Sequence, residues 1–70
     1  MTLHDSMILA INELGGEKQT IKDVADYINR HHLYHRRDGN PVPYSQISAR
    51  QNKYRHLFGN ANGYIWLINN

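Results

Sequence analysis

The 70-residue chain contains no cysteine, so it has neither a disulfide to stabilise it nor a thiolate metal site. No stretch reaches the roughly 18 apolar residues of a membrane-spanning helix. Residues 1–5 also lack the basic start and the apolar run that are typical of a signal peptide. We therefore expect a cytoplasmic protein that makes no membrane contact.

Acidic residues are scarce in the second part of the chain. Residues 1–29 carry two basic and five acidic residues, a net charge of −3, whereas residues 30–70 carry six basic residues and one acidic residue, a net charge of +5. That acid is Asp38, and none follows it. Such a division predicts a surface that attracts a polyanion, although basic side chains can also simply keep one face solvated.

Signals of catalysis are absent as well. The sequence offers no nucleophile-base-acid set, no phosphate-binding glycine loop and no paired carboxylates. A chain of this length buries only about 60% of its unfolded surface, which leaves little room for a substrate pocket beside a core. We expect residues 1–70 to form a single domain that is not an enzyme and needs no cofactor.

Residues 5–14 have the apolar spacing of a helix. The apolar positions follow one another at i, i+1, i+4 and i+7: Met7, Ile8, Ile11 and Leu14. Thr2 or Asp5 is suited to cap the start, and Gly15-Gly16 provides a left-handed stop.

A short strand is expected within residues 17–20, followed directly by a second helix. Thr20 has the features of an N-cap, with Asp23 three residues further on. This helix should run to Arg30 or His32. Its apolar stripe consists of Ile21, Val24, Ala25 and Ile28.

Residues 33–42 are predicted to be a loop, because residues 38–41 read Asp-Gly-Asn-Pro. Pro43 suits the first position of a third helix, which we expect to run to about His56. Its buried side would carry Ile47, Tyr54 and Phe58, flanked by Tyr44 and Gln51. Its opposite side collects Ser45, Ser48, Ala49, Asn52, Lys53 and His56. Small, polar and basic side chains of this kind suit a helix that lies in the major groove of DNA.

The C-terminal part predicts a hairpin. Asn62-Gly63 is a strong turn signal, and residues 64–68 are wholly apolar or aromatic, as a strand would be. Their partner would be Leu57-Phe58. The order helix, strand, helix, helix, hairpin predicts a mainly α (α+β) winged helix-turn-helix: three helices, a small three-stranded antiparallel sheet and a short wing without Lys or Arg.

Alternation along the last strand divides its side chains between two faces. Ile65 and Leu67 would point inward. The other face would carry Tyr64, Trp66 and Ile68. This face is either covered by Met1 and Leu3 or exposed as a surface for a dimer or another partner.

Five segments carry a resemblance to a known family. They are residues 20–29, residues 33–39 with their Leu-Tyr and Arg-Arg-Asp-Gly, residues 43–50 with Ile-Ser-Ala-Arg, residues 54–58, and residues 63–67. In this order they resemble the HARE-type helix-turn-helix family, over about two-thirds of the chain. The resemblance implies a winged helix that binds DNA in most settings and protein in at least one. Members are attached to restriction enzymes, methyltransferases and chromatin proteins, and one forms the amino-terminal domain of the bacterial RNA polymerase delta subunit.

The candidate DNA contacts form two groups. Those expected to face bases and backbone are Ser45, Ser48, Asn52, Lys53 and His56; those expected to steer and grip phosphates are Arg36, Arg37, Arg50 and Arg55. Arg50 has the alternative of covering the core and pairing with Asp23 or Asp26, and the two loop arginines that of a solvated turn. We expect double-stranded DNA as the partner, and a monomer or weak homodimer in a transcription-related or restriction-modification setting, associated with or fused to a larger enzyme.

Three histidines, His31, His32 and His35, have a spacing that zinc sites also use. A fourth ligand would have to come from His4 or Asp38. The alternative is that these imidazoles are partly charged groups near a polyanion, and we expect no metal.

Overall fold

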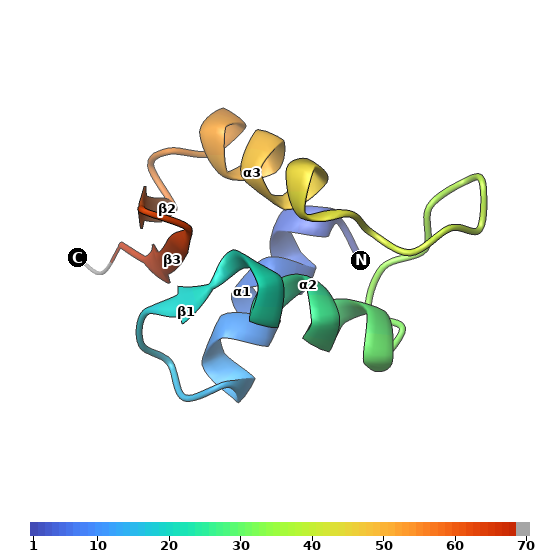
Figure 1. Cartoon of the computed structure of the whole chain (residues 1–70), viewed down its shortest axis with the longest axis horizontal. Helices are drawn as coiled ribbons and strands as arrows, with labels where there is room; N and C mark the ends of the chain where they lie inside the picture. The colour runs from blue at the N-terminus through green and yellow to red at the C-terminus, as the bar shows by residue number, and fades with distance from the viewer. Residues whose placement is uncertain (69–70) are drawn as a thin grey trace.

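The computed structural model describes residues 1–68 and consists of three helices and a small three-stranded antiparallel sheet (Figure 1). The elements are α1 (Leu3–Glu13), β1 (Gln19–Thr20), α2 (Ile21–Arg30), α3 (Tyr44–Lys53), β2 (Phe58–Ala61) and β3 (Tyr64–Leu67). This order and layout are compatible with a winged helix, so the predicted α+β class is confirmed. No helix among the described residues is both long and apolar enough to cross a bilayer.

The first helix is defined at both ends by local hydrogen bonds. The hydroxyl of Thr2 accepts from the N–H of Asp5 at 3.1 Å, so Thr2 is the cap and α1 begins two residues before the predicted start. At the far end, the N–H of Gly16 donates to the carbonyl of Ile11 at 2.8 Å, while Gly15 has φ 126°. This 6→1 bond is a Schellman motif, and it confirms the predicted glycine stop.

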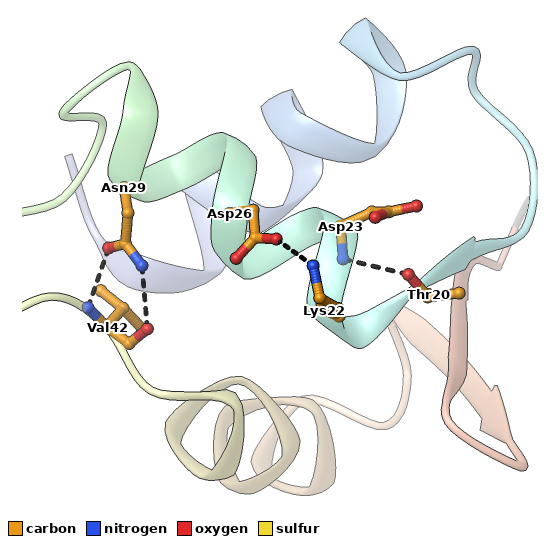
Figure 2. Close-up of polar contacts among 6 residues, drawn as sticks. All are labelled: Thr20, Lys22, Asp23, Asp26, Asn29 and Val42. Atoms are coloured by element: carbon orange, nitrogen blue, oxygen red, sulfur yellow. Dashed lines mark hydrogen bonds and ion pairs between the residues drawn. The ribbon is translucent and has the colours of Figure 1, made fainter.

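The second helix begins as predicted, since the Thr20 hydroxyl accepts from the N–H of Asp23 at 3.0 Å (Figure 2). It ends with the same motif as α1, but without a glycine. The N–H of Leu33 donates to the carbonyl of Ile28 at 3.0 Å, and His32 takes the left-handed position with φ 52°. A histidine therefore occupies a position that usually favours glycine.

The third helix is shorter than the sequence predicted. Pro43 is its N-cap rather than its first residue, and the helix ends at Lys53 instead of continuing to His56. Tyr54 leaves the helix with φ −118° and ψ 52°, and residues 54–57 form a turn. This turn lets Phe58 enter the core from β2, where it is 1% exposed. The predicted stripe of Ile47, Tyr54 and Phe58 is therefore divided among α3, the turn that follows it and β2.

A single core joins the three helices and the sheet. Its buried apolar residues are Leu3, Met7, Ala10, Ile11, Val24, Ala25, Ile28, Val42, Ile47, Phe58 and Ile65. Helix α1 contributes four of them and contacts α2, α3 and β3. In Figure 1 it crosses behind α2, with α3 above. This arrangement leaves the outer side of α3 uncovered.

The sheet has the order β1-β3-β2, so β3 is central. Phe58 pairs with Leu67 and Ala61 with Tyr64 across β2 and β3. The turn between these strands has two residues, Asn62 with φ 53° and Gly63 with φ 82°, as in a type I′ turn. The wing is therefore as short as predicted.

Candidate nucleic-acid interface

The outer side of α3 carries most of the predicted DNA contacts. Ser45, Ala49, Asn52 and Lys53 are exposed on the helix, Arg55 and His56 are exposed in the turn that follows it, and Ser48 and Arg50 are partly buried. The helix has no acid in its first turn and has Arg50 and Lys53 in its last. It therefore offers a surface of short polar side chains that becomes basic toward its C-terminal end.

Arg50 does not pair with an acid of α2. Asp26 instead accepts from Lys22 one turn away, with 2.8 Å between the Nζ and Oδ2 atoms (Figure 2). The hydrogen bond from Lys22 to Asp26, together with the charge of that carboxylate, raises the pKa of Lys22. Within residues 1–68 the other ion pair joins Arg36 and Asp38. Arg50 forms no ion pair within residues 1–68, so the alternative in which it pairs with Asp23 or Asp26 is wrong, whereas its partial burial agrees with a stem that lies over the core.

The start of α3 is held in place by a side chain that the sequence analysis did not single out. The Oδ1 atom of Asn29 accepts from the N–H of Val42 at 2.8 Å, and its Nδ2 atom donates to the carbonyl of Val42 at 3.0 Å (Figure 2). The Asn29 side chain thus forms hydrogen bonds with both the N–H and the carbonyl of Val42. It ties the segment that enters α3 to the last turn of α2.

The end of α3 is fixed in a similar way by Gln51. Its side chain is not merely beside the core, as expected, but only 3% exposed. The Nε2 atom donates to the carbonyl of Phe58 at 3.1 Å, and the Oε1 atom accepts from Asn60 at 2.7 Å. Because these bonds join α3 to β2, the helix is oriented at both ends by side-chain amide contacts.

The two loop arginines have different surroundings. Arg36 donates to the carbonyl of Pro41 at 3.3 Å and pairs with Asp38 at 3.2 Å, so it braces the loop. The backbone N–H of Asn40 also donates to Asp38 at 3.0 Å, and this bond, aided by the charge of Arg36, lowers the pKa of Asp38. Arg37 is exposed and makes no such contact within residues 1–68. Of the predicted pair, Arg37 is the one whose side chain makes no contact of this kind within the described residues.

The histidines near the end of α2 do not form a metal site. The ring of His31 lies 4.2 Å from that of Tyr27, whereas those of His32 and His35 are nearly parallel, with centroids 6.4 Å apart. No group of three or more His, Asp or Glu side chains in the described part of the chain is placed to hold a metal ion. The structure therefore gathers no ligand set for the zinc alternative.

The outer face of the sheet is not covered by the amino-terminal segment. Met1 is 71% exposed and Leu3 lies in the core, and Figure 1 places the N-terminus well away from the sheet. The indole of Trp66 lies against Gly59 instead, and Nζ of Lys18 is 5.3 Å from its centroid. Tyr64 and Ile68 remain 42% and 44% exposed. Coverage by Met1 and Leu3 is therefore wrong, and part of this face is open.

Comparison with models of known protein families, with curated proteins and with solved structures finds no match for this chain. The resemblance to the HARE-type helix-turn-helix family therefore stays a prediction, and it depends on the five segments in which it was seen.

Proposed function

We propose that this chain is a winged helix domain that binds double-stranded DNA with α3 in the major groove. The observation that carries the proposal is the outer side of α3. It is exposed, it consists of short polar and basic side chains, and no acid occurs anywhere after Asp38. A phosphate backbone attracts such a surface.

The side chains of this face suit different parts of a duplex. The amide of Asn52 can pair with an adenine edge in the major groove. Lys53, Arg50 and Arg55 are suited to phosphates, as is Arg37 in the loop before α3. Shorter contacts to bases and backbone would come from Ser45, Ser48 and His56. The Asn62-Gly63 turn carries no charge, so the proposed contact does not include the wing.

The proposed setting is a bacterial cytoplasm, where the domain would serve a transcription-related or DNA-modifying and restriction protein. A single module with about four phosphate contacts binds DNA weakly at physiological salt. It would therefore act as the recognition part of a larger fused or associated enzyme, or as a weak homodimer.

The test is fluorescence anisotropy with a labelled duplex of mixed sequence at several salt concentrations. With about four phosphate contacts, log affinity should fall against log salt with a slope of about −3 to −5. Lys53→Ala should weaken binding and reduce the slope by about 1. Lys18→Ala removes the same charge next to the sheet, and it should leave the affinity and the salt slope unchanged. No binding at low salt, or an equal loss in the two variants, would contradict the proposal.

A second candidate function is docking on a protein, such as RNA polymerase or another enzyme, through the face of Tyr64, Trp66 and Ile68. The exposure of Tyr64 and Ile68 favours it, because large apolar side chains in contact with solvent often mark partner surfaces. Amide shifts on addition of the duplex separate the two functions. Shifts in α3 and residues 33–43 support DNA binding, whereas none at low salt would leave the sheet face as the functional surface.

A further inference from the structure

A cleft lies between the end of α2 and the loop that leads to α3. Its lining includes His32, Tyr34, His35, Arg36, Asn40 and Pro41, and its volume is about 180 Å³. A cavity of about 150 Å³ holds one benzene molecule. The cleft is therefore of the right size for a single six-membered ring with its substituents.

The flat groups of the cleft come from three rings. Those of His32 and His35 are inclined by only 6° to each other, with centroids 6.4 Å apart, and the phenol of Tyr34 also lines the space. Imidazole and phenol rings are surfaces on which nucleobases stack in complexes with single-stranded nucleic acids. A planar ligand would find this type of surface in the cleft.

The polar groups of the cleft suit the edge of such a ring. The guanidinium of Arg36 is already oriented by the carbonyl of Pro41 and by Asp38. The side-chain amide of Asn40, which has both a donor and an acceptor, lines the cleft beside Asp38, with which it also forms a hydrogen bond. Stacking surfaces next to an amide and a guanidinium are the combination that recognises an unpaired base.

The backbone at His32 gives independent support. This residue occupies the left-handed position at the end of α2 with φ 52°, where glycine serves the helix end at a lower conformational cost. Helix termination therefore does not by itself require an imidazole at this point. Strained residues of this kind often belong to binding sites, where the side chain is in use.

The loop is also fixed at its two ends before any ligand arrives. The hydroxyl of Ser6 donates to the carbonyl of Leu33 at 3.0 Å, and Asn29 holds both backbone groups of Val42. The cleft is therefore preformed, so that a small ligand does not have to order the loop.

We propose that this cleft binds one unpaired nucleobase of pyrimidine size, stacked on His32 and His35, with its edge toward Arg36 and Asn40. The site is separate from the outer side of α3 and does not depend on groove docking.

The experiment titrates thymidine 5′-monophosphate and cytidine 5′-monophosphate into the isotope-labelled chain. We expect saturable shifts at His32, His35 and Asn40, and upfield shifts of the base protons, which report stacking. Deoxyribose 5-phosphate and inorganic phosphate are the controls that lack the base. If they produce the same protein shifts, the cleft is only an anion site and the proposal is wrong; it is also wrong if the nucleotides produce none at 20 mM.

Variants locate the site. His35→Ala should weaken nucleotide binding by about 5- to 150-fold, which corresponds to the roughly 1–3 kcal/mol that stacking contributes per base. His31→Ala removes an imidazole that packs on Tyr27 outside the cleft, and should have no effect. His32→Gly should fold at least as well as the parent chain and still lose affinity. Unchanged affinity in His35→Ala and His32→Gly would overturn the assignment.

The failure of this proposal is distinguishable from failure of duplex binding. Lys53→Ala should weaken the duplex complex and leave nucleotide shifts intact. His35→Ala should weaken nucleotide binding and leave the salt slope of duplex binding intact.

Discussion

Substitution of Gly59 by alanine should destabilise the chain because of one neighbour, the indole of Trp66. The two residues are cross-strand partners in β2 and β3. A Cβ atom at Gly59 would stand 2.7 Å from Cζ2 of Trp66 and closer still to Cε2 and Nε1. These are atoms of a ring that is already half-buried, so the indole would have to move away from the sheet.

The magnitude follows from two opposing effects. Forcing an extra methyl group into a packed contact costs about 1–3 kcal/mol. Alanine is better than glycine in a strand by about 0.5–1 kcal/mol, because it has less conformational freedom to lose on folding. The net loss in Gly59→Ala should therefore be on the order of 1 kcal/mol. With a urea m-value of about 1 kcal/mol/M, the midpoint should fall by about 1 M.

The assay is a double-mutant cycle with Trp66→Ala, followed by far-ultraviolet circular dichroism in urea. In the Trp66→Ala background the clash is gone, so Gly59→Ala should become neutral or slightly stabilising. The coupling free energy between the two positions should be about 1–3 kcal/mol. Because Trp66 is the only tryptophan, its fluorescence should also change in Gly59→Ala. An equal loss of stability in both backgrounds would refute the reasoning.

Three further predictions concern local contacts. Asn29→Ala leaves the N–H of Val42 without its acceptor and should lower the free energy of unfolding by about 1–3 kcal/mol in the same urea assay. A loss near zero would count against a stabilising role of the two hydrogen bonds between Asn29 and Val42. Thr20→Ala should cost about 1 kcal/mol and Thr20→Ser much less, because serine retains the cap; equal losses would count against capping. Asp38 has a pKa held below its ordinary value by the N–H of Asn40, so its stabilising contribution is present above the ordinary carboxyl pKa and is lost as the pH falls through the lowered value. Carbon-detected NMR titration of the Asp38 carboxyl checks this, and a pKa at or above the ordinary value would contradict it.

The features that could be predicted from the sequence depend on neighbours along the chain. The Thr20 cap, the Gly15 stop and the Asn62-Gly63 turn each involve residues within about five positions of one another. Caps and turns of this kind can be recognised from a single sequence. Because these elements follow one another in a characteristic order, the fold class followed from them.

The contacts that could not be predicted join residues far apart or depend on packing. Asn29 pairs with Val42 across the loop, 13 positions away, and no periodic pattern marks it. The apolar spacing of Ile47, Tyr54 and Phe58 fits a longer helix equally well, so the turn after Lys53 was missed. Packing of Phe58 into the core from β2 overrides that local pattern, as tertiary contacts often do.

The residues of α3 that hold the helix in place differ from those on its outer side, and this difference determines how the outer side can be tested. Three contacts orient the helix. Ile47 is buried in the core, and Asn29 binds the backbone at Val42, just before the helix begins. At the other end, Gln51 binds β2. The exposed side chains of Asn52 and Lys53 make no hydrogen bond or ion pair within residues 1–68, so the fold does not require these side chains. Surface substitutions of that kind usually change stability by less than about 0.5 kcal/mol. A loss of DNA binding in Asn52→Ala or Lys53→Ala, at an unchanged urea midpoint, therefore has to arise from the interface itself rather than from a displaced helix.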